Sequence, residues 1–545
     1  MASGNGTPDA PWSLAFALSG AGGALHAGDT LLLRGGTYLG KYLASLSGVT
    51  VRSAPGEWAV IDGFRITTLA AAITATQTSI TVVDSGGLKP ASALVIEDEW
   101  ISVQTVTGNV LGVVRGQGGK LKAPHTAGTL VVHGGNQLQV TGSDNTFRDF
   151  EIRNSDPVRT QVPPDAQSAP RLRGEGIFQL GSRNKFVNLV IRDCQDGLFD
   201  AHGVDTEFYG CLVFNNGYVA GGTYNGHGGY YENQAGLKKI RDCLFWNNCS
   251  MGTKAVGQTG NTINLLFDGC VFWNNGSERG LPGQRHRGLL VGANNGVCDQ
   301  VTVRDCLTYA PPGCNGAGIT MGFSGQNGAC VVTGNRCYGG TETIALANWA
   351  SFQVTGNRLA ITERAVGNNS NLGLVFLQRG AAPVSEVWEG TAYRNATVGD
   401  RKAYSYTIAG LRSFAEWKAD HPSFDAAATY QAGPLTGAEV IVQPNAYEAG
   451  RAHVIIYNWD SARTVNADLS GIGLTNGQRY EVRNVQNYDA PPVFTGIWDS
   501  AKPVVAIPMT DAGLTFPVGF EAAAMTTCLP RFGVFVVSPA AAPCP

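Results

Sequence analysis

One short phrase recurs along the middle of the chain and constrains its fold more than any other feature. The phrases VIRDCQDGLF, FYGCLVFNNG, IRDCLFWNNC, FDGCVFWNNG, VRDCLTYAPPG, VTGNRCYGG and VTGNRLAITE follow one another in this order. Each contains short alternating apolar runs and ends in a turn such as Asn-Asn-Gly, which is typical of strands and not of helices. One such unit cannot bury its apolar face alone, so the units must stack.

Stacked units of three short strands form a parallel β-helix in which each coil rises by about one strand spacing, ~4.8 Å. Aligning the phrases on one marker position predicts a column of inward-facing residues at one turn of the coils. The marker residues are Cys194, Cys211, Cys243, Cys270, Cys306, Asn335 and Asn357. We interpret most cysteines as buried thiols that act as small apolar side chains. Cys528 and Cys544 are candidates for a disulfide.

Length and composition agree with an elongated β protein. The chain has 545 residues, more than one hydrophobic core usually serves, so we expect a solenoid with accessory domains. Its 72 glycines, 43% apolar residues and 15% charged residues exclude a disordered or collagen-like chain. The 39 Lys and Arg residues balance 42 Asp and Glu residues without a basic run. Neither nucleic acid nor a membrane is therefore expected as a partner.

Changes in residue pattern along the sequence predict four segments. They are an N-terminal cap with the first coils (1–65), an inserted small β-domain (66–132), the β-helix (133–385) and a C-terminal β-sandwich with its linker (386–545). Asp9-Ala10-Pro11, followed by alternating large apolar residues, predicts a capped helix that covers the first coil. The insert is rich in Thr and Val, and the last segment contains alternating strands at short spacing.

The coil region resembles the pectate-lyase-like superfamily of right-handed parallel β-helix proteins. The repeats carry this resemblance together with Gly226-His227-Gly228-Gly229-Tyr230-Tyr231-Glu232-Asn233, which is similar to the Gly-His-Gly-x-Tyr-x-x-Asn phrase of bacterial β-helix-repeat proteins. The C-terminal segment resembles the β-sandwich that ends many glycosidases. The resemblance implies an all-β protein whose partner is a polysaccharide or oligosaccharide. The Asp-Asp pair of polygalacturonase-type hydrolases does not occur in this chain.

The resemblance also implies that substrate lies along one sheet, beneath the loops that precede its strands. Alternation along these strands predicts that Phe199, Gly229 and Thr253 point inward. The side chains predicted to point outward are Asp200, His202, Tyr230, Glu232 and Lys254. Two long loops, Asn215 to His227 and Asn274 to His286, are expected to flank them.

Three functions remain open for this face. In the preferred one, a secreted hydrolase cuts a glycosidic bond with the carboxylate pair Asp200 and Glu232, whose separation is expected to fall between ~5 and 9.5 Å. His227 then acts as an acid or base, or binds sugar hydroxyls, and His202 contacts the substrate.

In the second function, a lyase acts by β-elimination on a uronate polymer. Lys254 or Tyr230 is then the base, and Arg279, Arg285 and His286 bind the substrate. The third function is non-catalytic, a glycan-binding or phage-tail-like structural protein. We expect no metal site and no cofactor, with Ca²⁺ admitted only for a lyase. The expected location is secreted or periplasmic, although this sequence contains no signal peptide.

Overall fold

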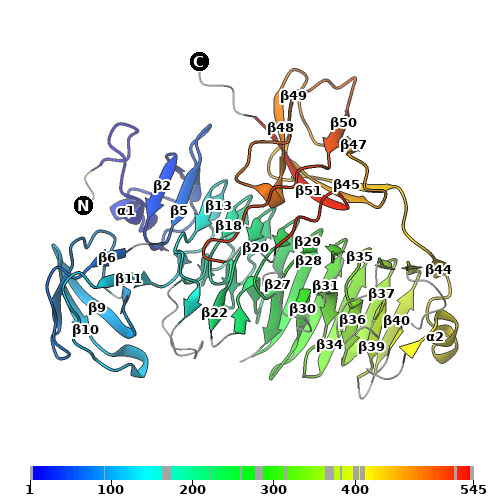
Figure 1. The fold of residues 1–545 in the computed structure, drawn as a ribbon, viewed down its shortest axis with the longest axis horizontal. Helices are drawn as coiled ribbons and strands as arrows, with labels where there is room; N and C mark the ends of the chain where they lie inside the picture. Colours follow the sequence, from blue (N-terminus) through cyan, green and yellow to red (C-terminus); the bar gives the residue numbers. More distant parts are fainter. Residues whose placement is uncertain are drawn as a thin grey trace. The chain divides into compact units, whose positions relative to one another are not determined.

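The computed structural model describes residues 4–64, 66–90, 92–161, 173–220, 223–257, 260–276, 286–311, 316–362, 373–380, 383–396, 404–405, 411–520 and 525–540. The chain divides into two compact units. The first contains residues 1–266, 290–298 and 518–520, and the second contains 267–289, 299–517 and 521–545. Almost all of the regular structure is β (Figure 1).

The first unit contains three parallel sheets, to which each coil gives one strand. Sheet one has the order β1 (Thr30–Leu33), β4 (Thr50–Ser53), β13 (Thr146–Arg148), β17 (Lys185–Val187), β20 (Glu207–Tyr209) and β25 (Lys238–Arg241). Sheet two has β2 (Gly36–Leu39), β5 (Ala59–Asp62), β14 (Glu151–Arg153), β18 (Val190–Arg192), β21 (Leu212–Phe214) and β26 (Leu244–Trp246). Sheet three has β3 (Tyr42–Ala44), β12 (Leu138–Val140), β16 (Ile177–Gln179), β19 (Leu198–Asp200), β24 (His227–Tyr231) and β27 (Met251–Gly257).

A left-handed residue forms the corner between sheets one and two in successive coils. The corner residues Asp149, Asn188, Gly210 and Asp242 have φ values of 59°, 53°, 62° and 51°. Asp, Asn and Gly are the residues that tolerate this backbone conformation, which explains why the repeats carry them there. The residue after each corner points inward and is fully buried: Phe150, Leu189, Cys211 and Cys243.

This register corrects the predicted column of marker residues. Val190 pairs with Leu212 and Leu212 with Leu244, so Leu189 and not Cys194 is the counterpart of Cys211 and Cys243. Cys194 belongs to the next corner, where its backbone N–H donates to Oδ1 of Asn216 at 2.9 Å. Asn216 in turn donates through Nδ2 to Oδ1 of Asn248 at 3.0 Å. The Asn-Asn-Gly turns thus build a ladder of buried amides, while the predicted burial of all five marker cysteines is confirmed.

The predicted insert is a separate antiparallel sheet of six strands. Its order is β6 (Ile66–Thr68), β11 (Leu130–Gly134), β8 (Ala93–Ile96), β9 (Glu99–Thr107), β10 (Val110–Val114) and β7 (Ser79–Thr81). Eleven buried side chains, among them Ile80, Leu94, Ile101 and Leu111, form a core of its own. Because the described strands of this sheet pair only with one another, the insert does not depend on the coils for its hydrogen bonds.

Deleting residues 66–132 is therefore expected to leave a folded protein. A short Gly-Ser loop would join the chain ends, and the coils would keep their ladder because none of their strands pairs with the insert. The far-ultraviolet circular dichroism and the gel-filtration volume of the deletion variant would measure this. An insoluble variant would show that the coils need the insert.

A buried carboxylate holds the insert together. Glu99 is 2% exposed and accepts from Arg115 Nε at 2.6 Å, while its Oε2 lies 2.9 Å from Nε2 of His125. Burial alone would raise the pKa of Glu99, but hydrogen bonds from Arg115, from the Ala123 N–H and from His125 outweigh it and lower the pKa to about 2. The folded pKa thus lies below the ordinary value of 4.5.

The stabilisation from Glu99 should be fully present above pH 4.5 and vanish as the pH falls through about 2. We therefore expect pepsin to cleave the insert slowly at pH 4 and much faster near pH 2, with the fragments identified by mass spectrometry. A Glu99→Gln variant should already be cleaved rapidly at pH 4. Equal cleavage of both proteins at pH 4 would contradict this role.

The second unit also contains strands of parallel sheets. Those of sheet one are β34 (Asn327–Thr333), β37 (Trp349–Thr355) and β40 (Ser385–Glu389). Those of sheet two are β29 (Val271–Trp273), β32 (Leu307–Tyr309), β35 (Arg336–Tyr338), β38 (Arg358–Ile361), β41 (Ala392–Asn395) and β44 (Thr429–Ala432). Those of sheet three are β33 (Gly316–Met321), β36 (Glu342–Ala347), β39 (Val375–Gln378), β42 (Tyr404–Ser405) and the antiparallel β43 (Leu411–Arg412). The strands β28 (Thr262–Asp268), β30 (His286–Ala293) and β31 (Cys298–Arg304) contain residues of both units.

The marker column of the second unit is as predicted. Leu307 pairs with Arg336 and Arg336 with Arg358, which aligns the preceding residues Cys306, Asn335 and Asn357. Asn335 donates through Nδ2 to Oδ1 of Asn357 at 2.9 Å, and its own Oδ1 accepts from the Cys306 N–H at 2.9 Å. Asparagine replaces cysteine here because its amide satisfies the backbone of the neighbouring coil.

Two short helices occur among the described residues, and the first is the predicted N-terminal one. Helix α1 (Leu14–Leu18) begins later than the sequence indicated, since its N-cap is Ser13 and not Asp9. Residues 7–10 form a bridged turn before it, so Asp9 cannot cap the helix. Helix α2 (Phe414–Asp420) begins with a capping box between Ser413 and Glu416. Single 3-10 turns lie at Ala21–Gly23, Gln117–Gly119 and Val485–Asn487.

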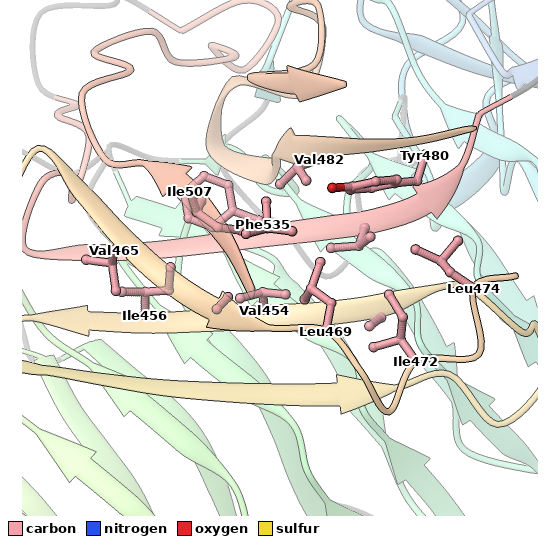
Figure 2. Close-up of a cluster of buried hydrophobic side chains, with 14 of the residues drawn as sticks. Val454, Ile456, Val465, Leu469, Ile472, Leu474, Tyr480, Val482, Ile507 and Phe535 are labelled. Carbon is pink, nitrogen blue, oxygen red and sulfur yellow. The ribbon is translucent and has the colours of Figure 1, made fainter. Parts of the chain in front are cut away.

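The C-terminal segment folds into antiparallel sheets that enclose one core (Figure 2). Five strands have the order β45 (Ala438–Pro444), β46 (Ala452–Asn458), β51 (Phe532–Pro539), β48 (Arg479–Asn484) and β49 (Phe494–Ile497). The strands β47 (Thr464–Asp468) and β50 (Val504–Pro508) form a second sheet. Val454, Ile456, Ile507 and Phe535 are fully buried between them. The predicted fold class, a β-helix solenoid with an inserted β-domain and a C-terminal β-sandwich, is confirmed.

Two further observations concern the described residues. No helix among them is long and apolar enough to span a membrane. Cys528 is buried, and its predicted partner Cys544 lies outside the described residues.

Candidate functional site

Sheet three of the first unit carries a group of outward-facing aromatic and ionisable side chains. These side chains lie on strands β16, β19, β24 and β27 and on the residues beside them, and we call this surface the outer face. Phe178, Phe199, Tyr230 and Lys254 are paired in register across the four strands, and their side chains point outward. The rings of Phe178 and Phe199 stack at 5.2 Å, and those of Phe199 and Tyr230 at 5.1 Å. Lys254 Nζ lies 5.4 Å from the centre of the Tyr230 ring.

A column of glycines sets the spacing of these strands. A Cβ atom on Gly176 would lie 2.5 Å from the carbonyl oxygen of Gly197, and one on Gly197 would lie 2.6 Å from that of Gly228. A Cβ atom on Gly228 would lie 2.5 Å from the oxygen of Gly252. The coils cannot approach so closely with any larger residue here. Gly228 of the Gly-His-Gly phrase therefore serves backbone packing.

Asp200 is not part of the outer face, and its predicted outward position is wrong. It pairs in register with the inward-facing Tyr231, is fully buried, and forms an ion pair with Lys238 Nζ at 2.8 Å. Phe199, predicted inward, occupies the outward position instead. The predicted alternation along β19 was correct, but it was shifted by one residue. Such a shift turns every side chain of the strand to the other face. The predicted pair of Asp200 and Glu232 does not exist on one face.

Glu232, Tyr230 and Lys254 do come together. The hydroxyl of Tyr230 donates to the carbonyl of Val256 at 3.2 Å and lies 3.4 Å from Oε1 of Glu232. Burial, together with the charge of Glu232, raises the pKa of Tyr230 far above its ordinary value, so the hydroxyl keeps its proton. Burial lowers the pKa of Lys254, although Asp196 and Glu232 oppose this shift. The face therefore holds a hydroxyl that stays protonated beside an amine whose pKa lies below that of an ordinary lysine.

Asp196 is a member of the site that the sequence reasoning missed. It lies one residue before Gly197, as His227 lies before Gly228 and Glu175 before Gly176. The Asp196 N–H donates to Oε2 of Glu175 at 2.9 Å, and Oδ1 of Asp196 accepts from the His227 N–H at 2.5 Å. The hydrogen bond from the His227 N–H ties the Asp196 carboxylate to the strand that carries Tyr230, and its charge acts on both Lys254 and Tyr230. The sequence feature that could have identified Asp196 is its position directly before the glycine that each of these coils carries.

The histidines of the prediction differ in their placement. His227 is half-buried at the start of β24, and its ring stacks on that of Tyr230 at 6.3 Å. It therefore belongs to the site. His202 is exposed just after the end of β19.

The side chains of the predicted substrate-binding cations Arg279, Arg285 and His286 lie outside what the structure describes. Arg279 and Arg285 lie outside the described residues, as does most of the loop from Asn274 to His286. His286 is the first residue of β30, and its side chain also lies outside the description. Among the described residues no group of three or more His, Cys, Asp or Glu side chains is arranged to hold a metal ion.

A comparison with family models agrees with the fold. A family model described as a right-handed β-helix region matches residues 100–272. Similar solved structures include a complex of XylC with xylose, at 10% identity over 98% of both chains and a TM-score of 0.34. A polygalacturonase from Erwinia carotovora ssp. carotovora matches at 11% identity over 76% of this chain and 91% of its own, with a TM-score of 0.32. The Dettilon tailspike protein matches at 10% identity over 98% and 92%, with a TM-score of 0.34. No curated protein matches the chain.

Proposed function

We propose that this protein is a carbohydrate-active enzyme that cleaves a polysaccharide on the outer face, by β-elimination next to a uronate carboxylate. The observation that carries the proposal is the contact of Lys254, an amine whose pKa burial lowers, with Tyr230, a hydroxyl whose pKa burial raises. A base and an acid with pKa values pushed in opposite directions are the pair that an elimination needs.

Each residue has a defined role in this reaction. The neutral amine of Lys254 removes the proton on the carbon next to the uronate carboxylate, and the new electron pair forms the C4–C5 double bond. The glycosidic bond at C4 breaks, and its oxygen takes the proton that Tyr230 holds. The Lys254 ammonium then returns its proton through solvent to the Tyr230 oxygen, which closes the cycle without any other reactant. In this proposal His227 binds the substrate carboxylate through a ring N–H.

The aromatic ladder supports a saccharide as the substrate. Phe178 and Phe199 are only half-buried although they are large and apolar, and they follow one another along the coils at about 5 Å. Flat apolar rings on an outward face offer a surface on which sugar rings stack. A chain of sugars that follows this ladder would bring one glycosidic bond to Tyr230 and Lys254.

A second candidate, hydrolysis of a glycosidic bond, is favoured by the carboxylate of Glu232. It lies next to the Tyr230 hydroxyl, and Asp196 is another carboxylate on the same face. Glu232 would then act on water or on the sugar, and no double bond would form. The two reactions are told apart by their products.

We expect purified protein to release products that absorb in the ultraviolet from at least one uronate polymer in a panel of pectate, alginate and glucuronan. Because only neutral Lys254 can act as the base, kcat/KM should rise with pH and level off at a pKa below 10.5, the ordinary value of a lysine. Reducing ends without ultraviolet absorbance would indicate hydrolysis instead. A rate that does not change with pH up to 10.5 would exclude Lys254 as the base.

A further inference from the structure

The second unit contains a cavity of about 560 Å³ that the proposed reaction does not use. It is lined by residues of strands β35, β38, β41 and β44 and by Leu435, Thr436, Ala438, Glu439 and Trp459. This volume falls within the range of small-molecule binding sites. The side chains that matter for its chemistry are Tyr338, Arg358, Arg394, Gln431, Glu439 and Trp459.

A segment that lines this cavity is fixed in place. It connects β44 to β45 and contains Gly433 and Gly437, whose φ values of 95° and 76° suit glycine. Arg394 donates through Nε to the carbonyl of Gly433 at 2.9 Å and through Nη2 to that of Pro434 at 2.6 Å. The rim of the cavity is therefore formed before any ligand arrives, which reduces the entropy lost on binding.

The charge around the cavity is positive. Glu439 is the carboxylate of the lining, and it contacts Arg336 Nε at 2.6 Å and Arg358 Nη1 at 3.2 Å. Its second oxygen accepts from the Tyr338 hydroxyl at 3.0 Å. Arg394 donates to neutral oxygens of Gly433, Pro434 and Gln431, so the lining carries two guanidinium groups, those of Arg358 and Arg394, and one carboxylate. Arg358 uses one nitrogen for its ion pair, and its side chain is 57% exposed.

An aromatic wall completes the cavity. The Trp459 ring is half-buried, stacks on Tyr457 at 5.7 Å and meets Tyr338 edge-on at 5.4 Å. It is not a member of the β-sandwich core. A rigid indole held by two tyrosines costs little further entropy when a ring stacks on it.

We propose that this cavity is a binding site for an acidic saccharide, separate from the outer face. The indole of Trp459 stacks on one sugar ring. The planar guanidinium of Arg358 forms an ion pair with a carboxylate of the sugar, because the two groups match in shape. The inference rests on the cavity alone and does not depend on the proposed function.

Isothermal titration calorimetry with trimers of galacturonate, mannuronate and glucuronate would test the site. The full-length Lys254→Met protein would be used so that no cleavage occurs. We expect at least one uronate trimer to bind, and neutral maltotriose to bind at least tenfold more weakly. Arg358→Ala and Trp459→Ala should each weaken binding about tenfold or more.

Arg304→Ala is the matched control, because Arg304 is an exposed arginine that also pairs with one carboxylate, Asp268, at 2.8 Å. It should bind the trimer like the parent protein. Absence of binding by all three uronate trimers, binding of maltotriose equal to that of the uronates, or unchanged binding by Arg358→Ala would each overturn the proposal. Melting temperatures of all variants would show that weaker binding is not caused by unfolding.

Discussion

Replacing Lys254 by methionine is expected to lower kcat/KM by about 10²- to 10⁴-fold, the usual contribution of a general base. Methionine keeps an unbranched apolar stem over the Tyr230 ring but cannot accept a proton. Because Lys254 forms no ion pair with the described residues and is only half-buried, the melting temperature should change little. Ultraviolet absorbance of the products under first-order conditions would measure the rate.

The companion variant Tyr230→Phe keeps the aromatic ladder and removes only the acid. It should lose a similar factor in rate while still binding substrate, since the ring stack on Phe199 remains. Lys239→Met is a suitable control, because Lys239 is a half-buried lysine of the same unit on sheet one. Full activity in both Lys254→Met and Tyr230→Phe would rule out the elimination, and loss of activity in Glu232→Gln alone would favour hydrolysis.

Replacing Asp200 by alanine is expected to destabilise the protein by about 3 to 5 kcal/mol, because it leaves a buried ammonium without its carboxylate. Lys238 is fully buried and reaches Oδ1 of Asp200 and the carbonyl of Glu232, at 2.8 Å and 2.6 Å. Guanidinium denaturation followed by circular dichroism would measure the free energy of unfolding.

The double variant Asp200→Leu with Lys238→Met should recover much of this loss, since neither residue then leaves a buried charge. Arg34→Ala should have little effect, because its ion pair with Glu57 at 2.9 Å is exposed. A stable Asp200→Ala protein would show that the buried pair contributes nothing.

The fold could be predicted from the sequence because each coil repeats its corner chemistry. Left-handed residues such as Asp149 and Asn188, and the buried ladder of Asn216 and Asn248, must recur wherever a coil turns. Alternation gave the spacing of outward residues but not which of two neighbours points outward. The apolar Phe199 suggested an inward position, yet the ring belongs to an outward ladder, and this error placed Asp200 on the wrong face.

The candidate site was partly predictable for the same reason. Tyr230, Glu232 and Lys254 lie on the predicted face, since the register error did not affect their strands. Asp196 was missed because it lies before its strand, where alternation does not apply, and only the hydrogen bonds between coils reveal its direction. The partner of Lys238 was not visible either, because an ion pair between strands of neighbouring coils, β19 and β25, leaves no periodic signal.

From β13 to β26, the one-residue corner between sheets one and two limits how this part of the protein can evolve. A residue gained or lost there would reverse the facing of the strand that follows and disrupt its pairing with the coils on both sides. From β13 to β26 the longest connections are instead those that enter sheet three, such as the chain between β21 and β24, which makes a small hairpin of β22 (Tyr218–Ala220) with β23 (Thr223–Asn225). Those connections end beside Tyr230 and Lys254. Under the proposed function, a lineage that varies its loops would therefore alter the choice of glycan first, while the scaffold that carries the reactive groups stays unchanged.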